Sequence, residues 1–383
     1  MSNRESMVPL KMLLFCFHGA NTLVISFLPL FLQYKGLNGS EIGWVLAIGP
    51  MAAIIAQPFW GYMSDKYQTV KRVLIICLVG LLISSVFFMQ MTSLPLLLSL
   101  GAVFFFFAAP IGALGDSLSQ RRADELGISF GTIRMWGSIG FATSSLVVGE
   151  FLSAVGIQFM IWPYLLLGGA ALAVCFKLSD VKVSAPPIKL NDLMKLIKNK
   201  PFVVFLGLVV FITITHRAND SFIGIYIAQL GGSESLIGIS WFVGVASEAL
   251  VFALAGFWFK KYHPLIFIVG AGILYTIRWF AYAYISDPIF IVALQFLHGL
   301  TFGVFYLTAF QYVTRLIPKL LQSTGHLVFV SVFFGFSGII GSLLGGSLID
   351  SMGGGSLYFF MGTLALIGSA LLAIYHLLPF WKE

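Results

Sequence analysis

Long apolar runs, separated by short polar turns, make up almost the whole chain. An α-helix needs about 20 apolar residues to cross the hydrocarbon core of a bilayer, and twelve runs reach that length. They are expected at about 8–34, 40–62, 71–91, 93–118, 130–152, 156–178, 201–229, 235–258, 264–285, 288–314, 322–348 and 354–379. The pattern predicts an all-α membrane protein with twelve transmembrane helices.

One connection is much longer than the others and divides the chain in half. Residues 179–199 are rich in lysine and contain Pro186 and Pro187, which is typical of a linker outside the membrane. We therefore expect an N-terminal six-helix bundle at 1–178, a cytoplasmic linker at 179–199 and a C-terminal six-helix bundle at 200–383.

The two halves also look related to each other. At a fixed offset of 195 residues, Ser26-Phe27 matches Ser221-Phe222, and Lys66-Tyr67 matches Lys261-Tyr262. Parallel repeats of six helices are an architecture of secondary transporters. The offset therefore favours two pseudo-symmetric bundles over twelve unrelated helices.

Composition agrees with a membrane protein and excludes several other classes. Only 10% of the residues are charged, against about 25% in soluble domains. The net charge of +7 does not indicate a nucleic-acid partner, because the basic residues lie in short loops. Cys16, Cys77 and Cys175 all fall inside apolar runs, so we expect neither disulfides nor a metal site, and no cofactor.

The distribution of Lys and Arg predicts the orientation. If the N-terminus is inside, 18 of the 22 basic residues fall in inside segments. Of the other four, Lys35 faces outside, and Arg134, Arg217 and Arg278 lie within spans. Inside loops of membrane proteins carry the excess of Lys and Arg, so both termini are expected in the cytoplasm. The chain is expected to be a multi-pass protein of the cell membrane, the inner or plasma membrane of a bacterium.

The loop between the second and third runs carries a recognisable string. The segment from Gly61 through Asp65 to Arg72 resembles the loop signature of the major facilitator superfamily. Gly61 is expected to let a neighbouring helix approach closely. Asp65 and Arg72 are expected to form a conformational latch through hydrogen bonds and ion pairing. The alternative is an ordinary turn with positive-inside charges.

Few ionisable residues lie within the spans, and such residues usually mark a pathway. Asp116 and Arg134 are 18 residues apart on consecutive helices and are expected to pair, although an interfacial salt bridge that only positions the loop is the alternative. A second set is expected to form one polar cavity in the C-terminal half: His216, Arg217, Asn219, Asp220, Glu248, Arg278 and His298. For a single buried histidine, a hydrogen-bonded packing role is the alternative.

Three strings carry a resemblance to the lactose permease-like branch of the major facilitator superfamily, and more closely to its phenylpropionate permease family. They are Ala56 to Lys66, Phe130 to Ser138 and Leu294 to His298. The resemblance implies that Arg134 pairs with Asp116 across the substrate and that Trp136 lies near its ring. It also matches Glu248, Arg278 and His298 to charged residues on helices 8, 9 and 10. The residues expected to bind substrate are His18, Asn21, Asp116, Arg134, Trp136, His216 and Asn219.

One position departs from the family pattern. Thr301 occupies the place of a proton-carrying glutamate one turn below the helix 10 histidine. Proton coupling is therefore expected to use Glu248, with Asp220 or His298 as alternatives, because burial favours the uncharged carboxyl. Arg278 is expected to displace the proton when it approaches.

The sequence thus predicts a secondary active transporter, not an enzyme. It is expected to be a monomer that moves a sugar, nucleoside or aromatic carboxylate together with protons by alternating access. A drug or metabolite exporter of the same fold is the nearest alternative, followed by a non-transporting membrane sensor. No motif of a metal-dependent, nucleophilic or nucleotide-binding enzyme is found.

Overall fold

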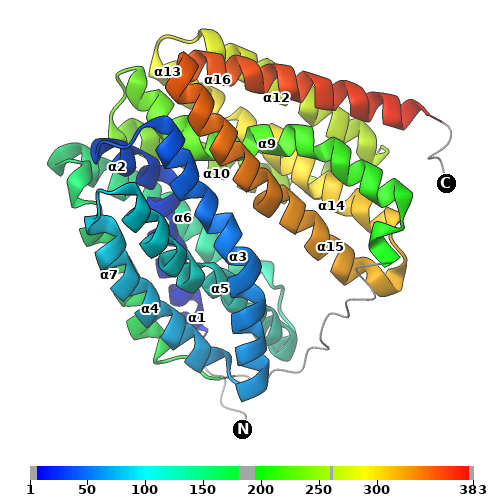
Figure 1. Ribbon diagram of the computed structural model, residues 1–383. Coiled ribbons are helices and arrows are strands. Elements are labelled where there is room, and N and C mark those ends of the chain that lie inside the picture. The colour runs from blue at the N-terminus through cyan, green and yellow to red at the C-terminus, as the bar shows by residue number, and fades with distance from the viewer. Residues whose placement is uncertain (1–6, 181–194, 259–261, 379–383) are drawn as a thin grey trace. The chain divides into compact units, whose positions relative to one another are not determined.

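The computed structural model describes residues 7–180, 195–258 and 262–378, and these residues fold into helices joined by short turns (Figure 1). The longer α-helices in the first half are α1 (Val8–Thr22), α3 (Gly39–Tyr67), α4 (Val70–Gln90), α5 (Leu94–Leu126), α6 (Gly131–Val155) and α7 (Ile161–Cys175). Those in the second half are α9 (Lys200–Gln229), α10 (Glu234–Ala253), α12 (Pro264–Tyr284), α14 (Val304–Leu316), α15 (Gln322–Val330) and α16 (Ser337–Leu377).

Shorter segments extend or connect these helices. Three are short α-helices, α2 (Leu28–Tyr34), α11 (Ala255–Trp258) and α13 (Pro288–Leu294). Two are 3-10 turns, η2 (Ile157–Phe159) and η4 (Lys319–Leu321), and three are π-helical, η1 (Leu23–Phe27), η3 (Gly299–Gly303) and η5 (Ser331–Phe336). Each π segment continues directly into an α-helix, so one membrane crossing often comprises several segments.

Eleven helical stretches among the described residues are long and apolar enough to cross a bilayer. The last stretch, Thr324–Leu377, has 54 residues, more than twice the length one crossing requires. It is broken at Gly353, whose φ of 80° and ψ of 168° are not helical. Glycine adopts a positive φ without a steric penalty, so it ends one crossing and starts the next. The described residues therefore make twelve crossings, as predicted.

Local signals explain where the helices begin. Asn38 and Glu41 form a reciprocal capping box at the start of α3, with the Asn38 Oδ1 accepting from the Glu41 N–H at 2.9 Å. Such a box satisfies two backbone donors that have no partner within the helix. At the start of α9 the Asn199 side chain accepts from the Phe202 N–H at 3.1 Å, and Pro201 follows in the first turn, where proline loses no hydrogen bond.

The chain forms two compact units. Unit 1 comprises Met1–Pro186 and Ser233–Phe242, and unit 2 comprises Pro187–Gly232 and Val243–Glu383. Helix α10 thus contributes its first residues to unit 1 and the rest to unit 2. The predicted boundaries, 1–178, 179–199 and 200–383, place the whole of α10 in the C-terminal bundle and so do not include this sharing. In all other respects the predicted division stays a prediction.

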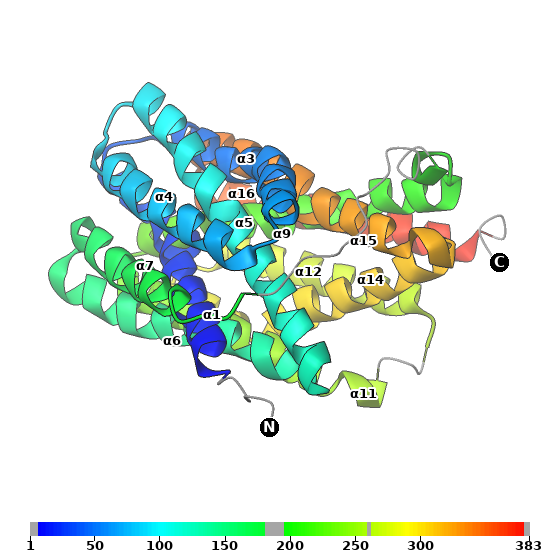
Figure 2. The same ribbon diagram turned by 90° about the horizontal axis from the view of Figure 1, so that it is seen from below.

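The same helix pairs pack in both units. In unit 1, α1 packs against α6 and α7, and α4 packs against α5 and α7 (Figure 2). In unit 2, α9 packs against α16, and α12 packs against α14 and α16. Counted as crossings, the third helix of each unit contacts the fourth and the sixth. This agreement supports the internal repeat inferred from the offset of 195 residues.

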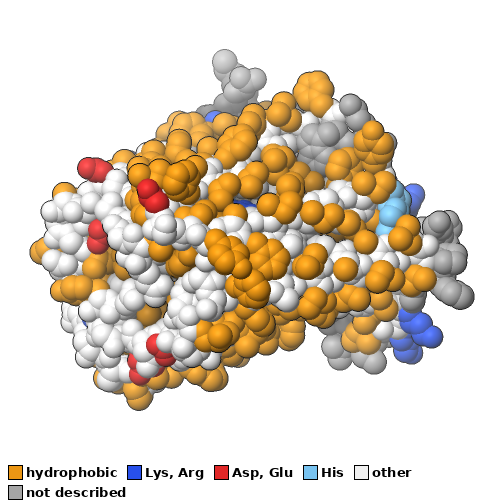
Figure 3. Space-filling model, turned by 90° about the horizontal axis from the view of Figure 1, so that it is seen from above, with side chains coloured by type: hydrophobic (Ala, Val, Ile, Leu, Met, Phe, Trp, Pro, Cys, Tyr) orange, Lys and Arg blue, Asp and Glu red, His pale blue; other side chains and the backbone are white. Residues whose placement is uncertain are grey.

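The outer surface is apolar where lipid would cover it. Hydrophobic side chains occupy much of the face shown in Figure 3, and charged side chains interrupt it at few places. Ile55, Leu166 and Phe257 are each at least two-thirds exposed. A soluble protein rarely exposes apolar patches of such extent, so the chain is a multi-pass membrane protein.

A close helix contact within unit 1 lies at Gly140. A Cβ atom at this position would collide with the backbone carbonyl of Phe15 on α1. We expect Gly140→Ala to lower the free energy of unfolding by about 1–3 kcal/mol, because the two backbones must separate. Thermal unfolding in detergent measures the effect.

A matched control is Gly169→Ala on α7, where a Cβ meets nothing within 4 Å. Replacing this glycine is expected to leave the melting temperature unchanged or raise it slightly. Equal melting temperatures for the two variants would contradict the packing assigned to Gly140.

Candidate functional site

In unit 1, one ion pair joins two helices within the membrane-spanning region. Arg134 lies at the start of α6 and Asp116 lies on α5, and Arg134 Nε is 2.9 Å from Asp116 Oδ1. Their side chains remain 32% and 39% exposed, respectively. The pairing predicted from the short connection is therefore observed. Because about a third of each side chain is exposed, both retain capacity to bind a solute.

Polar residues of α1 lie close to this ion pair. A Cβ at Gly137 would meet His18 Cδ2 at 2.5 Å and Arg134 Nη1 at 2.7 Å, so His18 and Arg134 flank Gly137. Among the described residues, His18 Nε2 has no hydrogen-bond partner. Asn21 is half-buried and lies three residues along α1, on the same face as His18. Unit 1 thus gathers one ion pair and an unsatisfied imidazole.

Trp136 has a different neighbour from the one expected. The ammonium of Lys11 lies 5.8 Å from the centre of its ring. This is a cation–π distance, and it associates Trp136 with the beginning of α1. Its predicted role beside a ligand ring stays a prediction.

In unit 2, α9 carries three ionisable residues within about one turn. Arg217 Nη1 contacts Asp220 Oδ2 at 2.7 Å, and His216 Nε2 lies 3.5 Å from the same oxygen. The other nitrogen of His216, Nδ1, is hydrogen-bonded to the buried hydroxyl of Tyr275 at 3.0 Å. His216 is only 3% exposed, whereas Arg217 is 24% exposed. The imidazole therefore connects the carboxylate to the interior of unit 2.

A second histidine–carboxylate pair continues from the first. His298 Nε2 is 3.8 Å from Glu248 Oε2, and Glu248 is 24% exposed. The rings of His216 and His298 are 5.6 Å apart between centres, and Phe302 lies against both. Asp220, His216, His298 and Glu248 thus form a continuous series of titratable groups. These four residues belong to the set predicted to form one polar cavity in this half, and the cavity itself stays a prediction.

The π-helical segments lie next to the candidate residues. Segment η1 begins two residues after Asn21, and η3 begins directly after His298. Segment η5 contains Phe333, whose ring packs on those of His216 and Phe302. A π turn is rare and often marks a functional site. No feature of the sequence pattern distinguishes these turns from regular helix.

Arg278 is fully buried, and its hydrogen bonds hold it to residues other than Glu248. Its side chain has 0% exposure. The guanidinium donates to Thr301 Oγ1 at 3.1 Å and to the Tyr282 hydroxyl at 3.2 and 3.3 Å. It also donates to the side-chain oxygen of Gln295. Tyr282 and Gln295 were not among the predicted site residues, although both are polar positions within apolar runs.

Asn219 serves packing in this structure. It is 2% exposed, and its Oδ1 accepts a hydrogen bond from the Tyr358 hydroxyl at 3.1 Å. The bond connects α9 to α16 within unit 2. This hydrogen bond explains why an amide side chain is buried at position 219. The predicted contact of Asn219 with substrate stays a prediction.

The predicted latch residues are arranged differently from the expectation. Among the described residues, a Cβ at Gly61 would meet no atom within 4 Å, so the close helix approach expected there is not observed. Asp65 and Arg72 are exposed. The carboxylate that receives hydrogen bonds from a helix start is Asp180, which accepts from the Val70 N–H at 3.0 Å and the Lys71 N–H at 3.1 Å.

Asp180 therefore fastens the end of the sixth crossing to the start of α4. It also accepts a hydrogen bond from the Thr69 hydroxyl, and Lys71 Nζ donates to the Phe176 carbonyl at 2.7 Å. The sequence signal was weak, because Asp180 is a single acid at the beginning of a linker. A carboxylate at a helix N-terminus satisfies backbone donors and complements the helix dipole.

We expect Asp180→Ala to loosen the start of α4 without unfolding the protein. Loss of a helix cap costs about 0.5–2 kcal/mol, so exchange of the Val70 and Lys71 amide hydrogens is expected to accelerate about 2- to 30-fold. Asp124→Ala is the control, since within the described part of the chain the Asp124 carboxylate accepts from the Gln120 side chain of its own helix. Unchanged exchange in Asp180→Ala would contradict this assignment.

Comparison with known proteins identifies the family. The family model described as the MFS_1 like family matches residues 7–360. The chain belongs to the MFS_1 like family. The maltose permease of Geobacillus stearothermophilus is 28% identical over 376 residues, covering 97% of this chain and 94% of the permease. The probable 3-phenylpropionic acid transporter of Escherichia coli K12 is 23% identical over 335 residues, covering 82% and 86%.

The fold has a close counterpart among solved structures. The crystal structure of the nucleoside transporter NupG superposes with a TM-score of 0.87 at 17% identity, covering 97% of this chain and 99% of NupG. The match confirms the predicted major facilitator fold of twelve helices. The resemblance drawn from the helix 2, 5 and 10 strings is confirmed as well. This MFS_1 like protein is a membrane transporter of small molecules and not an enzyme.

Proposed function

We propose that this MFS_1 like protein imports an uncharged, hydroxyl-rich solute, a sugar or a nucleoside, together with protons. Uptake proceeds by alternating access across a bacterial cell membrane, with a monomer as the working unit and both termini in the cytoplasm. The orientation rests on the excess of Lys and Arg in the inside loops. The similarity to a maltose permease supports the solute class.

The partly exposed Asp116–Arg134 pair carries the proposal. Together the two side chains offer carboxylate acceptors and guanidinium donors, with no net charge. Neighbouring hydroxyl groups of a sugar ring are donors and acceptors at once, so they can bind to both partners. Such a site recognises hydroxyls without requiring a charged solute.

The other arginines of the spans favour a neutral solute over an aromatic carboxylate. Arg217 is paired with Asp220 at 2.7 Å. Arg278 has 0% exposure and is held by neutral oxygens. A carboxylate solute bound to Arg134 or Arg217 would lie beside Asp116 or Asp220, and the two negative charges would repel each other in a low-dielectric region.

The proton is proposed to use the series of titratable groups in unit 2. Glu248 is the primary carrier, because it is the more exposed carboxyl of the series and lies 3.8 Å from His298. Asp220 already contacts Arg217 at 2.7 Å and lies 3.5 Å from His216, so it is less available as a carrier than Glu248. His298 relays between Glu248 and the interior, and Arg278 sets the local positive potential.

Uptake by right-side-out membrane vesicles tests the solute and its direction. Radiolabelled maltose, sucrose, adenosine, uridine and 3-phenylpropionate are offered with an imposed inward proton gradient. We expect accumulation of a sugar or nucleoside and no accumulation of the carboxylate. Accumulation of 3-phenylpropionate would overturn the solute class, and accumulation only by inverted vesicles would establish an exporter instead.

A further inference from the structure

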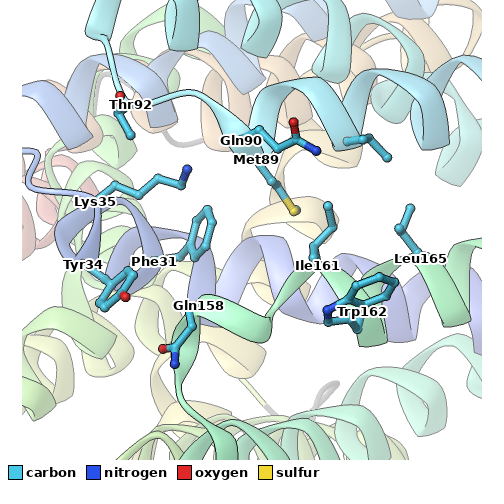
Figure 4. A pocket seen from close by; sticks show the side chains of 11 residues that line it. Phe31, Tyr34, Lys35, Met89, Gln90, Thr92, Gln158, Ile161, Trp162 and Leu165 are labelled. Carbon is cyan, nitrogen blue, oxygen red and sulfur yellow. The ribbon is translucent and has the colours of Figure 1, made fainter.

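A pocket lies within unit 1, away from the Asp116–Arg134 pair. It has a volume of about 540 Å³. It is formed by the end of α2 with Lys35, the end of α4 with Thr92, and the region from η2 into α7 (Figure 4). Arg134 is near the first residue of α6, whereas the pocket adjoins the turn after its last residue. At about 1.5 Å per residue, the two sites are roughly 30 Å apart along the helix.

The charged lining of this pocket is a lysine. Of the described residues that line it, Lys35 alone is charged. Its Nζ donates to the Met91 carbonyl at 3.0 Å and lies 5.0 Å from the centre of the Phe31 ring. An ammonium has three N–H donors, so two stay available to an anion. Burial lowers the pKa of Lys35, and an anion beside it would offset that cost.

Polar and apolar groups are separated within the pocket. Tyr34 and Gln158 are exposed polar residues on the side of Lys35, and Figure 4 shows Ile161, Trp162 and Leu165 following one another along α7. Trp162 is 64% exposed, and the adjoining Leu166 is 74% exposed. The apolar side therefore opens to the surface that lipid covers. Tyr and Trp are typical of the boundary between hydrocarbon and headgroups.

We propose that this pocket binds an anionic phospholipid of the outer leaflet. Its phosphate receives hydrogen bonds from Lys35, its headgroup contacts Gln158 and Thr92, and an acyl chain lies over Ile161 and Leu165. The distribution of Lys and Arg assigns this end of unit 1 to the outside, where Lys35 is the one basic residue of the loops. A single positive charge without a neighbouring acid in the lining selects an anionic headgroup over a zwitterionic one.

Native mass spectrometry of the purified full-length chain tests the proposal. The protein is titrated with phosphatidylglycerol, phosphatidylcholine or inorganic phosphate. We expect about fivefold tighter binding of the first phosphatidylglycerol than of phosphatidylcholine, the effect of one lysine at a membrane surface. Inorganic phosphate is not expected to compete at millimolar concentration, because it lacks the acyl chains.

Three variants make the outcome specific. Lys35→Gln is expected to abolish the preference for phosphatidylglycerol over phosphatidylcholine. Lys35→Arg is expected to retain this preference, and it is the variant to measure if Lys35→Gln does not fold. Lys177→Gln, an exposed lysine outside the pocket, is expected to behave as wild type. An equal affinity for the two lipids, an unchanged preference in Lys35→Gln, or displacement of the lipid by inorganic phosphate would each overturn the proposal.

Discussion

Replacing Glu248 with Gln is expected to abolish proton-driven accumulation of the solute while leaving exchange of solute across the membrane. One elementary charge moving through 100 mV supplies about 2.3 kcal/mol, enough for roughly 50-fold accumulation at one proton per solute. Without its carrier, the transporter equilibrates the solute, and the ratio of inside to outside concentration falls to about 1. Gln keeps the shape of the side chain and cannot lose a proton.

Two uptake assays separate the possibilities. Accumulation is measured under an imposed proton gradient, and exchange is measured as counterflow from vesicles preloaded with unlabelled solute. Glu125→Gln is the control, because Glu125 is 47% exposed and pairs with Arg122 on its own helix. Glu248→Gln variants that still accumulate the solute would exclude Glu248 as the carrier, and the same assays on Asp220→Asn and His298→Gln would then identify which group replaces it.

The second large effect is expected at the ion pair in unit 1. Arg134→Ala and Asp116→Asn each remove hydrogen bonds to a charged group, and each such bond contributes about 1.5–3 kcal/mol. We therefore expect solute affinity to fall roughly 10- to 100-fold in either single variant. The double variant is expected to lose less than the sum of both, because removing both partners leaves no unpaired charge at the site.

Thermal-shift titration of purified protein with the transported solute measures these affinities. The surface pair Arg122–Glu125 is a matched control, since its distance of 2.8 Å is similar and both residues lie on one helix. We expect Arg122→Ala to bind the solute as wild type does. An unchanged affinity in Arg134→Ala would show that the solute binds elsewhere.

The membrane crossings could be predicted because their length and apolar character are imposed by the bilayer. The runs expected at 322–348 and 354–379 placed a break between these two crossings, and the structure has it at Gly353. Regular helix lies directly before and after this residue. The pairing of Asp116 with Arg134 was predictable for a related reason: a short connection makes α5 and α6 consecutive antiparallel helices, so a separation of 18 residues suffices to align the side chains. Local rules thus determine these features.

Other features depend on tertiary contacts that the sequence pattern does not encode. Arg278 was expected to act on Glu248, yet its position is governed by Tyr282, Gln295 and Thr301. Asp180 is separated from Val70 by 110 residues, so nothing local indicates that it caps α4. Arrangements of this kind require the packed unit, and they are also where the predicted roles of single residues changed most.

Proton movement caused by the solute tests the central claim most directly. Right-side-out vesicles in weakly buffered medium, without an imposed gradient, receive a pulse of the transported sugar or nucleoside while the external pH is recorded. Because the solute is neutral, coupled uptake is expected to make the medium transiently alkaline in wild type, and Glu248→Gln is expected to give no pH change. Uptake of the solute without alkalinisation in wild type would contradict proton-coupled import.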